Sequence, residues 1–95
     1  PDIEEAVVIG QVQGFNDRPN ARTEMHRMVA LAGLVRGGFA SGDLSTVMSP
    51  RTLISWAENL ITFGDIDTAF RLSFENKCDP AELPILHEYY QRVFG

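Results

Sequence analysis

The stretch Leu44-Ser45-Thr46-Val47-Met48-Ser49-Pro50-Arg51-Thr52 marks the point at which one predicted helix gives way to the next. Its second half predicts a helix start, because serine accepts hydrogen bonds from free first-turn N–H groups and proline suits the first helical position. Apolar residues then recur at helical spacing up to Gly64: Leu53, Ile54, Ala57, Leu60 and Ile61, with Trp56 beside them. We therefore expect a short extended connector over 44–48 and a helix that begins at Pro50 and ends at Gly64.

Two helices are predicted upstream of this connector. The first covers about 2–13, with acids in its opening turn, where the helix dipole favours them, and Gly14 as its end. Its apolar face is expected to carry Ile3, Val7 and Gly10, and the polar segment 16–20 reads as a loop.

The second upstream helix covers about 22–40. Thr23 is its predicted cap, and its apolar stripe consists of Met25, Met28, Val29, Ala32, Val35 and Phe39. The pair Gly37-Gly38 weakens its last turns by about 1 kcal/mol per glycine relative to alanine. Either the helix bends there or another group packs closely against the bare backbone.

Two more helices are predicted downstream. Asp65 caps the fourth, whose buried face should carry Ile66, Ala69, Phe70, Ser73 and Phe74. Asp79-Pro80-Ala81-Glu82 is a further start signal, followed by an apolar stripe of Leu83, Leu86, Tyr89, Tyr90 and Val93. Pro84 deletes a first-turn hydrogen bond, so the start of this fifth helix can lie a few residues further on. Helices joined by short loops, with no alternating strand pattern, predict an all-α fold: one small bundle of about five helices over residues 1–95.

Charge and composition exclude several classes of function. The net charge of −5 opposes binding to nucleic acid, and the eight Lys and Arg residues form no cluster that could neutralise a phosphate backbone. The apolar runs are too short to span a bilayer, and the acidic N-terminus does not resemble a signal peptide. Cys78 is the single cysteine, so no internal disulfide forms and a reducing cytoplasm is expected. Since the chain does not open with Met, we expect a piece of a longer protein or a processed product.

Arg51 is the candidate functional residue. It lies in the first turn of a predicted helix, where free N–H groups and the dipole already present positive charge. A cation there costs a few tenths of a kcal/mol up to about 1 kcal/mol, so helix stability does not explain its presence. A bound anion would explain it, because the helix start and the guanidinium would then point at the same phosphate. The alternative is an arginine that pairs with a nearby acid or extends into water.

No other constellation predicts chemistry. His26 and His87 have no companions at metal-ligand spacing, so no metal site is expected and both are interpreted as structural. The chain lacks a Gly-x-x-x-x-Gly-Lys-[Ser/Thr] phosphate loop, a Gly-x-Ser-x-Gly elbow and a Cys/His nucleophile pair. We therefore do not expect the fragment alone to be an enzyme.

The segment 43–52 nevertheless resembles the lid subdomain of MoxR-like AAA+ ATPases. The similarity continues through Trp56-Ala57-Glu58-Asn59, Ala69-Phe70-Arg71-Leu72-Ser73-Phe74, Asn76-Lys77-Cys78-Asp79 and the terminal Glu88-Tyr89-Tyr90-Gln91-Arg92-Val93-Phe94-Gly95. These blocks are similar to the C-terminal end of the ATPase subunits of aerobic cobaltochelatases. The resemblance is close from about Met28 onward and looser before it.

This resemblance implies a role for each residue at the predicted helix start. Arg51 matches the family's sensor-2 arginine, which contacts the γ-phosphate of ATP, and Ser49 and Pro50 match the turn that directs it. ATP and Mg would be held by the α/β subdomain of the same chain in a hexameric ring. Together with other cobaltochelatase subunits, that ring would drive insertion of cobalt into a corrin. The alternative is a stand-alone helical module that binds a partner protein and has no nucleotide role.

Overall fold

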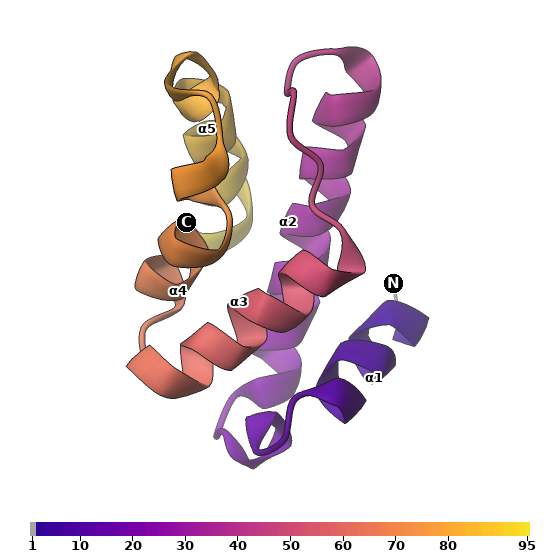
Figure 1. The fold of residues 1–95 in the computed structure, drawn as a ribbon. Helices are drawn as coiled ribbons and strands as arrows, with labels where there is room; N and C mark the ends of the chain where they lie inside the picture. Colours follow the sequence, from indigo (N-terminus) through magenta and orange to yellow (C-terminus); the bar gives the residue numbers. More distant parts are fainter. Residues whose placement is uncertain (1) are drawn as a thin grey trace.

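Five α-helices make up the part of the chain that the computed structural model describes, residues 2–95 (Figure 1). They are α1 (Asp2–Gln11), α2 (Ala21–Ser41), α3 (Pro50–Phe63), α4 (Ile66–Ser73) and α5 (Leu83–Phe94). Short 3-10 turns η1 (Phe15–Asp17), η2 (Glu75–Lys77) and η3 (Pro80–Glu82) lie in the connections. No strand occurs in the described residues, so the predicted all-α bundle is confirmed. No helix in this part of the chain has both the length and the hydropathy needed to cross a membrane.

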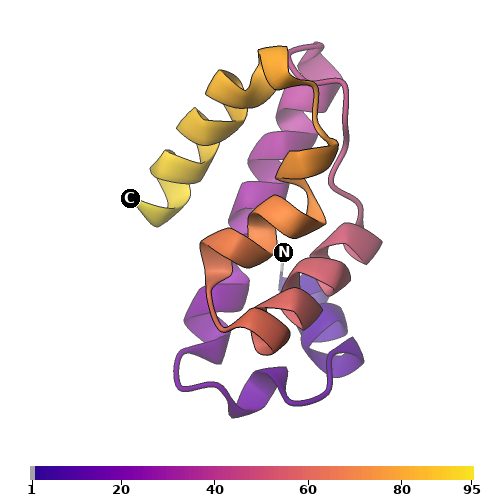
Figure 2. The same cartoon turned by 60° about the vertical axis from the view of Figure 1, so that its left-hand side comes forward.

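The long helix α2 is the axis around which the other elements are arranged. Near its N-terminal half, α1 and α3 pack against it and against each other, while α5 packs along its C-terminal half (Figures 1 and 2). Helix α4 turns back tightly against α3. The connector over 42–49 runs back beside α2, so that α3 begins near the middle of the molecule (Figure 1).

One continuous apolar core joins these elements. The largest fully buried side chains come from every helix and from the connector: Trp56, Phe15, Phe70, Phe74, Met25, Met28, Leu31, Met48, Leu53, Leu60, Leu86 and Val8. Ser73 is buried with them, as expected, because its hydroxyl accepts a hydrogen bond of 2.8 Å from the Asn59 side-chain amide. This core fixes the body of α3 against both halves of the molecule.

The predicted ends of α3 and α4 are confirmed. The Ser49 hydroxyl accepts a bond from the Thr52 N–H, and the Asp65 carboxylate accepts one from the Thr68 N–H. At Gly64 the chain turns in the left-handed conformation (φ 76°) that ends α3. The Asp79 signal begins η3 instead of the fifth helix, and α5 itself starts at Leu83. The start therefore lies further on, as Pro84 indicated.

Four predictions made from local patterns are wrong. Thr23 does not cap α2, because the helix already begins at Ala21 after Asn20. In α1, Ile3 and Val7 are 82% and 50% exposed, and Val8, with Val12 just after the helix, is buried in their place, because α1 meets α2 and α3 with a different face.

Phe39, which was placed in the stripe of α2, is 46% exposed. At this end of α2, Gly38 faces Tyr89 of α5 and Leu44 of the connector, and the neighbouring Phe39 is left exposed. Ile61 at the end of α3 is also exposed.

Candidate functional site

The start of α3 is a closed cap. Ser49 has an extended backbone (φ −80°, ψ 167°), and its side-chain oxygen accepts the Thr52 N–H at 3.3 Å. The Ser49 carbonyl accepts the Leu53 N–H at 3.2 Å, and the Ser49 and Thr52 hydroxyls lie 3.1 Å apart. Pro50 occupies the first helical position, where its fixed φ suits the helix and its missing N–H costs nothing. The turn is therefore well defined before any ligand arrives.

This cap leaves one backbone donor of the first turn available. Pro50 has no N–H, and those of Thr52 and Leu53 are already bonded. The Arg51 N–H has no acceptor among residues 3–95, and the Arg51 side chain is exposed. Backbone donor and guanidinium therefore belong to the same residue at the positive end of a helix, where the dipole favours negative charge.

Arg51 also has no side-chain partner among residues 3–95, the residues whose side chains the structure describes. Arg18, Arg36, Arg71 and Arg92 each pair with a carboxylate, whereas Arg22, Arg27, Lys77 and Arg51 do not. Among these four, Arg22 lies at the same second position of a helix, but the first turn of α2 contains Glu24. The first turn of α3 contains no acid. Among residues 3–95 Arg51 is therefore not ion-paired, and an exposed side chain of this kind is common to an anion-binding arginine and to one that extends into water.

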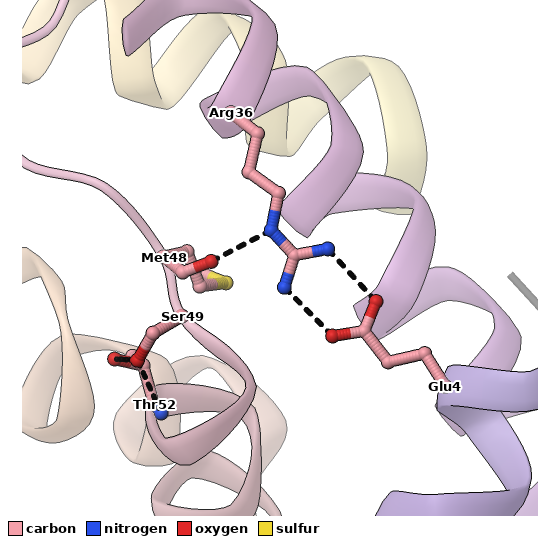
Figure 3. A network of polar contacts seen from close by, with 5 residues as sticks. All are labelled: Glu4, Arg36, Met48, Ser49 and Thr52. Carbon is pink, nitrogen blue, oxygen red and sulfur yellow. Dashed lines mark hydrogen bonds and ion pairs between the residues drawn. The ribbon is translucent and has the colours of Figure 1, made fainter.

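A second arginine fixes the connector that leads into this turn (Figure 3). Arg36 of α2 donates from Nε to the Met48 carbonyl at 2.8 Å, and from its two terminal nitrogens to the Glu4 carboxylate of α1 at 2.8 and 2.7 Å. The hydrogen bonds from Arg36 lower the pKa of the Glu4 carboxyl, against the opposing effect of its partial burial. This network ties α1, α2 and the connector together one residue before the cap.

The sequence analysis missed this network. Glu4 was interpreted as an acid that suits the dipole of its own helix, and Arg36 was not singled out. The two residues are separated by 32 positions, so no local pattern pairs them. The one available signal was that Arg36 is the single charged residue of the stretch 28–40, which is otherwise apolar.

The remaining candidate groups have structural partners. His26 lies 2.9 Å from the Glu5 carboxylate, and His87 contacts Glu75, so each histidine joins two elements. Cys78 is half-buried and donates to the Phe74 carbonyl, and burial raises the pKa of its thiol. No group of three or more His, Cys, Asp or Glu side chains in residues 2–95 is placed to hold a metal ion.

The start of α3 is not enclosed by the chain itself. The best-defined surface hollows among the described residues lie between other elements, for example beside α5 at Tyr90 and beside α2 at Arg22. None of these hollows is lined by Ser49, Pro50 or Arg51. Of the three predicted site residues, Pro50 and Arg51 are thus exposed at the surface, and Ser49 is half-buried.

Comparison with known proteins places these features in a family. A family model described as CbbQ/NirQ/NorQ C-terminal matches residues 5–80. One relative, the aerobic cobaltochelatase subunit CobS of Sinorhizobium sp, is 51% identical over 94 residues, which are 99% of this chain and 28% of the relative. This chain therefore spans a little over a quarter of that protein's length. No solved structure matches. The matches confirm the resemblance to cobaltochelatase ATPase subunits that the sequence indicated.

Proposed function

This chain belongs to the CbbQ/NirQ/NorQ C-terminal family, and from that premise we propose that it is the nucleotide-sensing lid of an AAA+ ATPase. The observation that carries the proposal is the state of Arg51. It is an exposed arginine without a partner in residues 3–95, it lies in the first turn of α3, and no acid shares that turn. A γ-phosphate placed there would accept from the guanidinium and from the backbone N–H of the same residue.

The isolated chain is expected to bind ATP weakly. One guanidinium and one helix start supply a few charge-assisted hydrogen bonds, each contributing about 1.5–3 kcal/mol before the entropy cost of association. Pro50 and Arg51 are exposed at the start of α3, so a nucleotide bound to Arg51 would need further residues to shield it from water. In the proposal, the lid supplies the cationic contact and other residues supply the pocket.

The roles of the remaining parts of the ATPase are inferred from the family resemblance. The α/β subdomain of the parent chain would hold ATP and Mg, and neighbouring copies would complete a hexameric ring. ATP would bind between the subdomains. Arg51 would then stabilise the negative charge that spreads over the transferring phosphoryl group. The ring would act with other cobaltochelatase subunits, and ATP hydrolysis would drive cobalt insertion into a corrin.

Binding of two nucleotides by the full-length parent tests the proposal. Arg51→Ala should weaken binding of a non-hydrolysable ATP analogue more than binding of ADP, because ADP lacks the phosphate that Arg51 is proposed to contact. Arg22→Ala is the matched control, since it removes an exposed arginine without a partner in residues 3–95 from the same helical position in α2. Equal loss of affinity for both nucleotides in Arg51→Ala would contradict a γ-phosphate contact.

A second candidate function rests on the outer face of α1. Ile3 and Val7 are largely exposed there, which is typical of a surface that meets a partner protein. In that case the chain would be a helical interaction module with no nucleotide role. Val7→Glu would then abolish association with other subunits, while Arg51→Ala would leave both nucleotide affinities of the parent unchanged.

A further inference from the structure

The direction in which α3 begins depends on a carbonyl that a neighbouring helix holds. The Met48 side chain is fully buried, and its carbonyl oxygen accepts a bond from Arg36 Nε. All three nitrogens of the Arg36 guanidinium are used, because the other two bond the two oxygens of Glu4 (Figure 3). A planar guanidinium whose three nitrogens are bonded cannot rotate without breaking a contact. The peptide that joins Met48 to Ser49 is therefore held in two ways, by the bond from Arg36 to its carbonyl and by the buried Met48 side chain.

We propose that Arg36, held in place by Glu4, is a positioning residue for Arg51. Met48 lies directly before the capping residue Ser49, and Arg51 is the second residue of the helix that this cap starts. The orientation of the Met48 peptide thus sets the point at which the Arg51 guanidinium and N–H are presented. This inference rests on the proposed function of Arg51.

The packing of α3 separates this role from general support of the fold. Leu53, Trp56 and Leu60 are fully buried and hold the body of α3 without help from Arg36. The Glu4–Arg36 pair lies at the edge of the core, with side chains 19% and 34% exposed. Loss of Arg36 should therefore leave α3 formed and packed but leave its entry peptide free to shift. A shift of about 1 Å in a group that contacts a reacting phosphate can lower a rate about a hundredfold.

Lysine cannot replace Arg36 in this arrangement. Its single nitrogen carries the same charge, but it cannot donate in the plane of one fork to Met48 and to both oxygens of Glu4. Arg36→Lys therefore preserves charge and most of the packing while it removes the geometry. Arg18→Lys is a matched control, because Arg18 also grips a carboxylate with two nitrogens, at 2.8 and 3.1 Å from Glu24, and has similar exposure. That pair lies at the N-terminal end of α2 and makes no hydrogen bond to the connector.

The experiment measures kcat and KM for ATP in the full-length parent with Arg36→Lys, Arg51→Ala and the double variant. Arg36→Lys should lower kcat/KM roughly tenfold or more. In the Arg51→Ala background it should cause no further loss, because a positioning residue has no effect once the group that it positions is gone. Arg18→Lys should have kcat and KM close to those of the unchanged protein.

Glu4→Gln serves where Arg36→Lys fails to fold, since it keeps Arg36 and its bond to Met48 while weakening the anchor. It should give a smaller loss of kcat/KM that also vanishes in the Arg51→Ala background. Two results would overturn the positioning role alone. One is a set of kcat/KM losses that multiply fully in the double variants, and the other is an Arg36→Lys enzyme as active as Arg18→Lys. An Arg51→Ala enzyme with unchanged kcat and KM would overturn the proposed function, and the positioning role with it.

Discussion

The phenol of Tyr89 lies directly against the backbone of Gly38. A Cβ built on Gly38 would be 2.8 Å from the Tyr89 hydroxyl oxygen and 3.1 Å from Cδ1 of Leu44. This is where α2 meets both α5 and the connector, and α2 remains helical through Ser41. Of the two explanations for the Gly37-Gly38 pair, the close approach to bare backbone is therefore the one confirmed, and it applies to Gly38.

The two adjacent glycines should respond in opposite ways to alanine. Gly38→Ala introduces a clash that costs about 1–3 kcal/mol of overpacking, less about 1 kcal/mol gained from helix propensity. Gly37→Ala meets no atom within 4 Å and should stabilise the chain by about 0.5–1 kcal/mol. Urea denaturation of both variants measures the difference. Equal free energies of unfolding for the two variants would contradict the packing of Tyr89 on Gly38.

The cap of α3 should contribute to stability independently of any ligand. Ser49→Ala removes the acceptor for the Thr52 N–H and should lower the free energy of unfolding by about 1 kcal/mol. Ser49→Asn, which restores a capping oxygen, should recover most of that loss. The measurement is the denaturation midpoint at constant m-value, and an Ala variant as stable as the original would show that the cap is not formed.

Acid should weaken the fold through Glu4. Because Arg36 lowers the folded-state pKa of Glu4 below its ordinary value of 4.5, the unfolded chain binds more protons in that range. The contribution to stability is complete above pH 4.5 and disappears as the pH falls through the lowered folded pKa. Hydrogen bonds from Thr68 also lower the pKa of Asp65, so this carboxylate too contributes stability that is lost in acid.

Thermal melting as a function of pH measures this effect. Glu4→Gln should be less stable than the original protein at neutral pH, and its melting temperature should fall less below pH 4.5. Asp65→Asn should reduce the acid sensitivity separately, because the two sites do not share partners. Parallel curves for Glu4→Gln and the unchanged protein would show that the ion pair does not contribute to folding.

The buried Trp56 should report the cooperativity of the whole domain. It is the only tryptophan of the chain, it is fully buried, its indole N–H donates to the Ile66 carbonyl at 3.1 Å, and its ring lies 4.9 Å from that of Phe70. Its fluorescence should therefore shift to longer wavelength at the same denaturant concentration at which far-UV circular dichroism loses helix. Two separate transitions would contradict a single folding unit.

What the sequence predicts well is what a few adjacent residues decide. Ser49-Pro50 and Asp65 locate the starts of α3 and α4 because a cap is a contact between residues two or three positions apart. Pro84 likewise indicated that α5 begins after the Asp79 signal. The placement of Arg51 in a first turn, and so the electrostatic argument about it, follows from these local contacts.

What the sequence could not predict depends on distant neighbours. Helix α1 offers two apolar faces, and only its contacts with α2 and α3 decide that Val8 is buried and Val7 is not. Arg36 and Glu4 are joined through space across 32 positions, so the residue that fixes the entry to α3 leaves no periodic signal. The structure therefore shows which residues support the start of α3, whereas the sequence alone already places Arg51 there.

The ATPase rate of the full-length parent carrying Arg51→Ala tests the central claim most directly. Arg51 is exposed, and alanine is an excellent helix former, so the variant should melt at or slightly above the original temperature. Its turnover should nonetheless fall about a hundredfold to a thousandfold, the usual effect of removing one donor to developing charge. Arg22→Ala, matched in exposure and helical position, should keep its rate. If Arg51→Ala melts normally and hydrolyses ATP as fast as Arg22→Ala, Arg51 is not the nucleotide sensor.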